Sequence, residues 1–139
     1  MAMDMKIIGF NLTKLSGDKN PDFLGKLEVK SNINLVSIEK EKLDLSKQDA
    51  VKVIFEFKID YGTLGSVLLS GNLFLILDSK TNKEVLSGWK DKNLSNDIKV
   101  PILNIILQKA SLKALQLEEE LGLPPHISFP RLQSNESKK

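Results

Sequence analysis

The chain has 139 residues, 41% of them hydrophobic and 27% charged, which is typical of one globular domain. Twenty basic and 18 acidic residues give a formal net charge of +2, too balanced for a protein that binds nucleic acid through a basic surface. The absence of cysteine excludes disulfides, thiol nucleophiles and cysteine-ligated metal sites.

The first and last residues of the sequence bear on where the protein acts and on where its domain ends. The first ten residues lack the apolar segment of a signal peptide, and no apolar run approaches the ~18 residues of a membrane helix. We therefore expect a cytoplasmic protein that does not insert into a membrane. Residues 1–132 are expected to form a single domain, and the polar residues 133–139 a disordered tail.

Alternating apolar residues predict a first strand over residues 6–14. Ile8, Phe10 and Leu12 fall on one face of this segment, and polar residues lie mostly on the other. Residues 16–22 combine Gly, Asp, Asn and Pro, which is turn chemistry. We therefore expect the first strand to end before residue 16.

A second strand is predicted over residues 26–38. Its apolar alternation slips by one position after Leu35, and such a slip predicts a β-bulge or a sharp twist. The charged stretch 39–48 still alternates at Leu43 and Leu45. This stretch either extends the second strand or crosses over an edge of the sheet.

The third predicted strand is the clearest. Its apolar face carries every second residue: Val51, Val53, Phe55, Phe57, Ile59 and Tyr61. Charged residues fill most of the opposite face, as in an antiparallel sheet with one covered side.

A fourth strand is predicted over residues 66–78, and it is apolar on both faces. One face carries Val67, Leu69, Leu73, Leu75 and Leu77. The other carries Leu68, Phe74 and Ile76. A single layer of helix covers only one face of a sheet, so the second face predicts a subunit contact or an exposed groove.

Two helices are predicted after the strands. Thr81 and Glu84 have capping-box spacing and predict the start of a short helix that ends near Lys92. Pro101 suits the first position of a long helix, and Gly122 suits the residue just beyond its end.

The long helix is apolar all round in its first half, which predicts that it is buried on several sides. Its last turns, Glu118 to Glu120, are expected to be solvated. An apolar extended segment with Ile127, Phe129 and Leu132 follows the helix.

Few residues offer catalytic or metal chemistry. His126 is the only histidine, and without a second histidine or a cysteine the common zinc sites are excluded. A general base needs an orienting partner, and the sequence shows none for His126, so we interpret it as a packing or surface residue. The sequence therefore predicts a protein that is not an enzyme and uses no cofactor or metal.

The order of elements resembles that of the protein-export chaperone SecB and its SecB-like relatives. The resemblance rests on the last strand with Leu73-Phe74-Leu75-Ile76-Leu77, the opening Val100-Pro101-Ile102 of the long helix, and its ending Gly122-Leu123-Pro124-Pro125-His126-Ile127-Ser128-Phe129. It implies an α+β fold: a four-stranded antiparallel sheet followed by a short and a long helix packed on one face.

The resemblance also implies a function. It implies a homo-oligomer, a dimer of dimers, that binds unfolded or nascent polypeptides in apolar grooves without ATP and takes part in protein export. The export chaperone is typically acidic, whereas this chain is slightly basic, which argues against coupling to the SecA motor. A chaperone linked to a toxin–antitoxin pair remains an alternative within this fold.

Two sets of contact residues are predicted. The oligomer interface is expected to use Trp89, Ile102, Ile105, Ile106 and Leu112, the last four facing a neighbouring subunit or the sheet. The client groove is expected to use Phe74, Ile76, Ile127, Phe129 and Leu132. A second function class, a structural or adaptor protein on a larger assembly such as the ribosome, also stays open, and contact with nucleic acid is expected only there.

Overall fold

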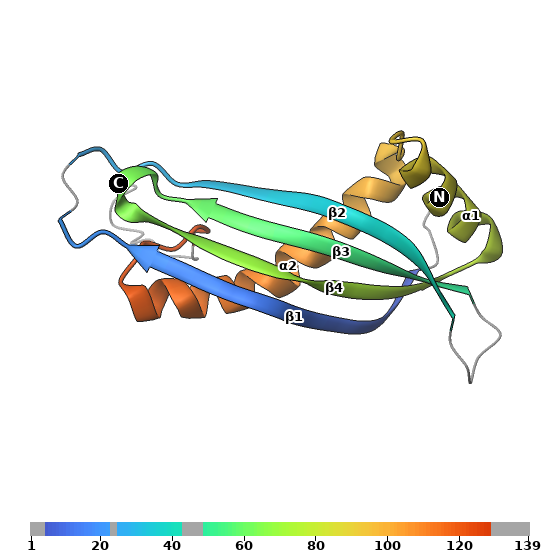
Figure 1. The fold of residues 1–139 in the computed structure, drawn as a ribbon, viewed down its shortest axis with the longest axis horizontal. Coiled ribbons are helices and arrows are strands. Elements are labelled where there is room, and N and C mark those ends of the chain that lie inside the picture. The colour runs from blue at the N-terminus through green and yellow to red at the C-terminus, as the bar shows by residue number, and fades with distance from the viewer. Residues whose placement is uncertain (1–4, 23–24, 43–48, 129–139) are drawn as a thin grey trace, which may run out of the picture.

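The computed structural model describes residues 5–22, 25–42 and 49–128. In this part of the chain four antiparallel strands form one sheet in the order β1-β4-β3-β2, and two helices follow. The elements are β1 (Met5–Lys19), β2 (Lys30–Lys42), β3 (Asp49–Asp60), a 3₁₀ turn (Gly62–Leu64), β4 (Gly65–Leu77), α1 (Ser79–Lys90) and α2 (Asn96–Leu121). The predicted α+β fold is confirmed: α2 runs diagonally across one face of the sheet, and α1 stands at one end (Figure 1).

The centre of the core lies between β3, β4 and α2. All six apolar residues predicted for one face of β3 are fully buried, and the same face of β4 is buried from Val67 to Leu77. Gly71 interrupts this apolar row, because a Cβ there would collide with the backbone oxygen of Asn11 and press on the ring of Phe55. The missing side chain lets β1 approach β4 closely and lets Phe55 stack on Phe10, with ring centroids 5.4 Å apart.

The two edge strands differ from the sequence predictions in their bounds: β1 is longer than residues 6–14, and β2 runs from Lys30 to Lys42 rather than over residues 26–38. The turn predicted over 16–22 is wrong in its first half, because β1 continues to Lys19, which pairs with Gly65 of β4. Continuous pairing with β4 overrides the local turn preference. The bulge predicted in the second strand is confirmed: the register of β2 against β3 shifts between Leu35 and Ser37, and Ile38 is buried beyond it.

The start of α1 is set by a different residue from the one predicted. Asp78 is the N-cap, and its carboxylate accepts a hydrogen bond from the backbone N–H of Thr81 at 2.8 Å. Thr81 is therefore a buried residue of the first turn rather than the cap. Side chains of Asp and Thr both suit the N-cap position, and the cap site falls where β4 ends.

The two ends of α2 show one wrong and one confirmed prediction. The helix begins at Asn96, so Pro101 lies inside it rather than at its first position. Pro101 lacks an N–H and so leaves the backbone oxygen four residues before it without its helical partner, near the start of the helix. Gly122 ends the helix as predicted, with a φ of 71° and the N–H of Leu123 donating to the carbonyl of Glu118 at 2.8 Å.

The helix faces the sheet along one row of residues spaced by four. The buried row is Ile98, Ile102, Ile106, Ala110, Ala114 and Glu118. Small residues in the second half of this row let the helix axis approach the sheet. Among the described residues, neither helix combines the length and the apolarity that a membrane crossing requires.

Candidate functional site

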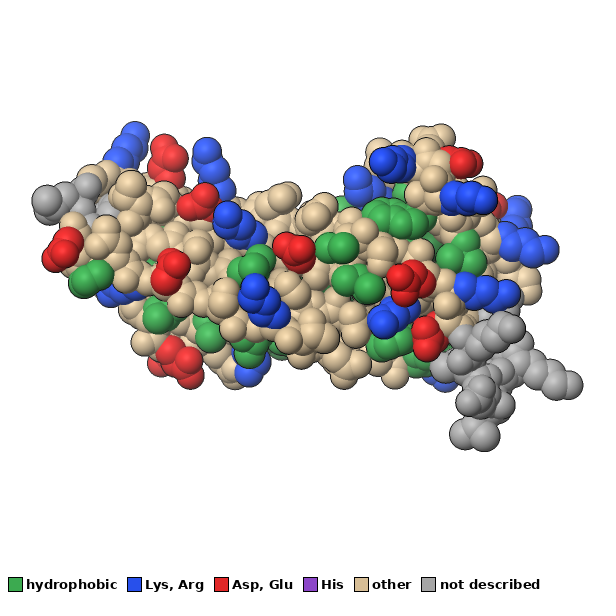
Figure 2. All heavy atoms as spheres, in the orientation of Figure 1, with side chains coloured by type: hydrophobic (Ala, Val, Ile, Leu, Met, Phe, Trp, Pro, Cys, Tyr) green, Lys and Arg blue, Asp and Glu red, His purple; other side chains and the backbone are tan. Residues whose placement is uncertain are grey.

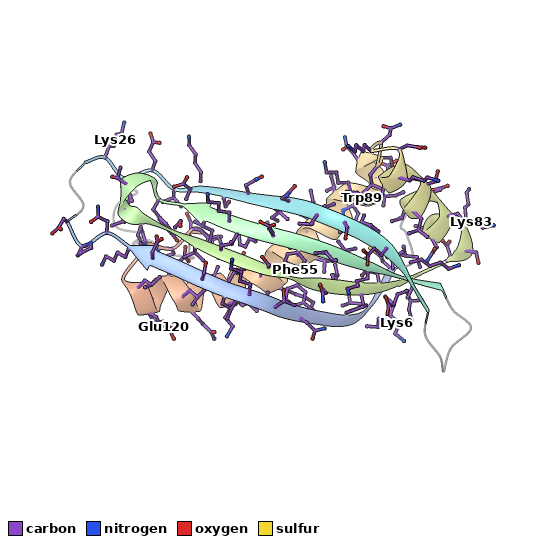
Figure 3. The ribbon with its side chains drawn as sticks, in the orientation of Figure 1. Lys6, Lys26, Phe55, Lys83, Trp89 and Glu120 are labelled. Carbon is purple, nitrogen blue, oxygen red and sulfur yellow. The ribbon has the colours of Figure 1, made fainter. Side chains whose placement is uncertain are left out.

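A groove with a mixed apolar and polar lining opens where α1 and the start of α2 meet the edge strand β2. Its volume is about 270 Å³, and we call it the Trp89 groove; it is lined by Asn34, Leu35, Trp89, Lys92, Leu94 and Lys99. The three apolar residues are partly exposed and also pack against the core. Figure 3 shows Trp89 between α1 and the edge of the sheet. The groove therefore has a fixed apolar floor that solvent can reach.

The chain conformation after α1 shapes one wall of this groove. Helix α1 ends with the N–H of Asn93 donating to the carbonyl of Gly88 at 2.7 Å and the N–H of Lys92 donating to that of Trp89 at 3.0 Å. Lys92 has a φ of 55°, a left-handed conformation in which glycine is the usual residue. This reversal places Leu94 beside Trp89 in the groove lining.

The edge of β2 runs along the same groove. Leu35 and Asn34 belong to β2, which pairs with β3 on one side only within the described chain. An edge strand presents unpaired N–H and C=O groups to which an extended peptide can hydrogen-bond. The arrangement thus joins apolar contacts for a side chain with backbone groups for a main chain.

The sheet face opposite α2 carries two of the predicted groove residues. Phe74 and Ile76 lie half-buried on this face, and the ring of Phe74 covers Gly9 of β1, which leaves space for it. Figure 2 views this face and shows apolar side chains scattered between charged ones. Phe74 and Ile76 are therefore a second apolar surface, separate from the lining of the Trp89 groove.

The predicted interface residues separate into core and surface. Ile102 and Ile106 are completely buried in the core beside the sheet, which is one of the two surroundings predicted for them. Ile105 is partly buried, whereas Leu112 is 68% exposed. Val100, which lies on the same helix, is also exposed.

The segment after α2 supplies the last predicted residues. Ile127 is 41% exposed, so it is available at the surface. Phe129 and Leu132, the other two groove residues predicted in this segment, lie outside the described residues.

A buried polar cluster joins this segment to α2 and the sheet. Nδ1 of His126 lies 2.9 Å from Oε1 of Glu118, and Nε2 lies 3.0 Å from Oγ of Ser111. The hydroxyl of Tyr61 donates to the other oxygen of Glu118. Phe57 meets the imidazole edge-on, with the ring centres 5.5 Å apart. The prediction that Glu118 is solvated is wrong, since it is 1% exposed.

Burial defines the protonation state of the tyrosine in this cluster. Removal from water, followed by the hydrogen bond and charge of Glu118, raises the pKa of the Tyr61 hydroxyl far above its usual value. Tyr61 therefore remains a neutral donor to the carboxylate. Hydrogen bonds of this kind are what a buried carboxylate requires.

The cluster shares its bonding order with a serine hydrolase triad, but its surroundings do not suit catalysis. Ser111 is only 7% exposed and lies inside α2, where neighbouring N–H groups are already used in the helix. The backbone N–H groups next to Ser111 are therefore not available as oxyanion donors. A cavity of about 400 Å³ reaches Glu118, yet neither Ser111 nor His126 lines it. We therefore interpret the cluster as structural.

No group of three or more potential ligands in the described residues is arranged to hold a metal ion. The donor atoms of the cluster already bond to one another: Glu118 accepts from Tyr61 and contacts His126. The open groove beside the edge strand β2 offers apolar side chains and backbone hydrogen-bonding groups together.

The chain was compared with known proteins, and no family model or curated protein matches its sequence. Among solved structures, it is similar to the SecB-like chaperone Rv1957 of Mycobacterium tuberculosis, determined in complex with a ChAD peptide from the HigA1 antitoxin. That match has 8% identity and a TM-score of 0.51, and covers 94% of this chain and 91% of the other. The fold is SecB-like.

The chain is also similar in structure to a protein of unknown function from Streptococcus agalactiae. It has 10% identity and a TM-score of 0.52, and the match covers 94% of this chain and 100% of that one. The likeness at such low identity lies in the fold, which is the one expected from the order of strands and helices.

Sequence reasoning missed most of the groove lining. Trp89 was predicted as an interface residue, and Leu35 was placed only in a strand, because their meeting depends on contact between α1 and β2. The first helix ends at Lys90, near the predicted Lys92, which lies in the turn just beyond it. The one available signal was Trp89 itself, the single tryptophan in the chain.

Proposed function

We propose that this protein is an ATP-independent chaperone of the holdase type, which binds unfolded or nascent polypeptides and keeps them from aggregating. The observation that carries the proposal is the open groove around Trp89, in which three apolar side chains lie beside β2, an edge strand of the described sheet. Contact with apolar side chains contributes roughly 25 cal/mol per Å² buried and is non-directional, so such a groove accepts many sequences.

The SecB-like fold supports this proposal. The neighbour from Mycobacterium tuberculosis is described as a chaperone and holds a peptide from an antitoxin. A dedicated chaperone of an antitoxin is accordingly the second candidate function for this chain. Action in the cytoplasm and a link to protein export are parts of the leading proposal that rest on the fold resemblance.

We also propose that the chain works as a homo-oligomer, a dimer of dimers. The outward side of α2 carries exposed apolar residues at Val100, Leu107 and Leu112. Exposed apolar residues on a long helix are suited to pack against a second copy. Ile102 and Ile106 do not take part, because they are enclosed by their own sheet.

The chaperone proposal is tested by aggregation of a chemically denatured client, followed by light scattering without nucleotide. The full chain should suppress aggregation at equimolar subunits, and Trp89→Ala should reduce the suppression several-fold. Leu86→Ala is the matched control, since Leu86 is also a partly buried residue of α1 packed on the core but does not line the groove. Absence of suppression by the unmodified chain would overturn the proposal.

A further inference from the structure

Two lysines border the Trp89 groove. Lys92 and Lys99 are both exposed and both belong to its lining, while Leu35, Trp89 and Leu94 supply its apolar surface. Within the described residues neither lysine forms an ion pair. The groove therefore combines an apolar floor with two ammonium groups that have no carboxylate partner in that part of the chain.

The carboxylates nearest in sequence to Lys92 and Lys99 do not lie in the groove lining. Asp91 and Asp97 are exposed residues of the same stretch, but neither lines the groove. Figure 2 shows Lys side chains gathered around the apolar surface at the α1 end of the molecule. Both charged residues in the groove lining are lysines, although the whole chain is nearly balanced in charge.

The backbone of Lys92 supplies a second, independent observation. It is the one non-glycine residue with a positive φ in the described chain. Glycine adopts this conformation without the steric cost that a Cβ brings, so the fold alone favours glycine at this position. Non-glycine residues held in this way cluster at binding sites, where the side chain has a use.

We propose that the Trp89 groove selects polypeptide segments in which a large apolar side chain is flanked by Asp or Glu. The apolar side chain would lie on Trp89, and the flanking carboxylates would meet Lys92 and Lys99. This inference rests on the proposed chaperone function and adds to it the class of segment that is bound. Exposed charge pairs contribute only modestly to the binding free energy. They therefore determine which segments are preferred, while the apolar contact supplies most of the affinity.

The test uses two short extended peptides without Trp or Tyr, identical except that the apolar residue is flanked by Glu in one and by Gln in the other. Trp89 is the only tryptophan, so its fluorescence in the full chain reports binding at this groove. The Glu peptide should bind about three- to tenfold more tightly at low salt. The preference should disappear near 1 M salt, where the screening length is ~3 Å.

Two variants and a control locate the effect. Lys92→Gly should raise the melting temperature by about 2–4 °C, because glycine adopts a positive φ without the steric cost of a Cβ. The same variant should lower the preference for the Glu peptide. Lys99→Ala should lower the preference too. Lys83→Ala removes the same charge from the side of α1 away from the groove (Figure 3) and should leave the preference unchanged.

Equal binding of the two peptides, or a preference that Lys92→Gly and Lys99→Ala both leave intact, would overturn the inference and leave the chaperone proposal standing. A Trp89 signal that responds to neither peptide would overturn the assignment of the groove as a polypeptide site, and the inference with it.

Discussion

Nδ1 of His126 lies 2.9 Å from Oε1 of Glu118, and both side chains are at most 2% exposed. The contact joins the segment beyond α2 back onto the helix, eight residues apart in sequence. Tyr61, at the end of β3, donates to the same carboxylate, so one buried group connects sheet, helix and the segment that follows. Removal of the Glu118 carboxylate would leave two buried polar partners, Tyr61 and His126, without it.

Glu118→Ala is therefore expected to destabilise the fold by about 2–6 kcal/mol, because it leaves the Tyr61 hydroxyl and a ring nitrogen of His126 without their partner, at about 1–3 kcal/mol each. Urea unfolding followed by circular dichroism measures the change. Glu119→Ala is the matched control, because Glu119 is exposed and its removal should change the free energy of unfolding by less than about 0.5 kcal/mol. Equal effects of the two variants would contradict the buried cluster.

Asp78 predicts a dependence of stability on pH. Hydrogen bonds from the side chain and the backbone of Thr81 lower the pKa of this carboxyl below its usual value. A depressed pKa contributes stability above the unfolded pKa of about 3.9, and this contribution is lost as pH falls through the lower folded value.

Asp78→Asn keeps a capping side chain but cannot titrate. Its stability should be close to that of the unmodified chain at pH 7, and the difference between the two should shift in favour of the variant below about pH 4. Urea unfolding at pH 7 and pH 3 measures this. A constant difference between the two proteins over that range would argue against the cap.

Substitutions at two positions of α2 distinguish a core residue from a residue of the proposed interface. Ile106→Asp places a charge in the enclosed core, so it should unfold the chain or leave it molten, seen as lost cooperativity in thermal unfolding. Leu112→Asp changes a side chain that is 68% exposed, so the subunit should stay folded. If α2 forms the oligomer contact, this variant should lower the mass measured by light scattering.

Gly71→Ala should destabilise the sheet by about 1–3 kcal/mol, the typical cost of overpacking. The added methyl group would meet the backbone oxygen of Asn11 and the ring of Phe55, and both belong to well-packed elements. Ser70→Ala, at the neighbouring position of β4, is the control and should have little effect. Calorimetry measures the melting temperatures of the two variants, and a lower value is expected for Gly71→Ala only.

Much of the fold could be predicted from local sequence alone. The period of two in β3 and β4 identifies their buried face, since adjacent strand residues point to opposite sides of a sheet. Gly122 marks the end of α2 because few other residues adopt its backbone conformation readily. Each of these signals lies within a few residues of the element that it defines.

Tertiary structure alone decided the rest. Glu118 sits in a run of three glutamates that looks solvated, yet Tyr61, 57 residues away, binds it in the core. β1 runs through a segment of turn-forming residues because β4 pairs with it. The Trp89 groove forms where α1 meets a strand distant in sequence. Local patterns record backbone preference and amphipathicity, whereas these features arise from contacts between segments that no local pattern encodes.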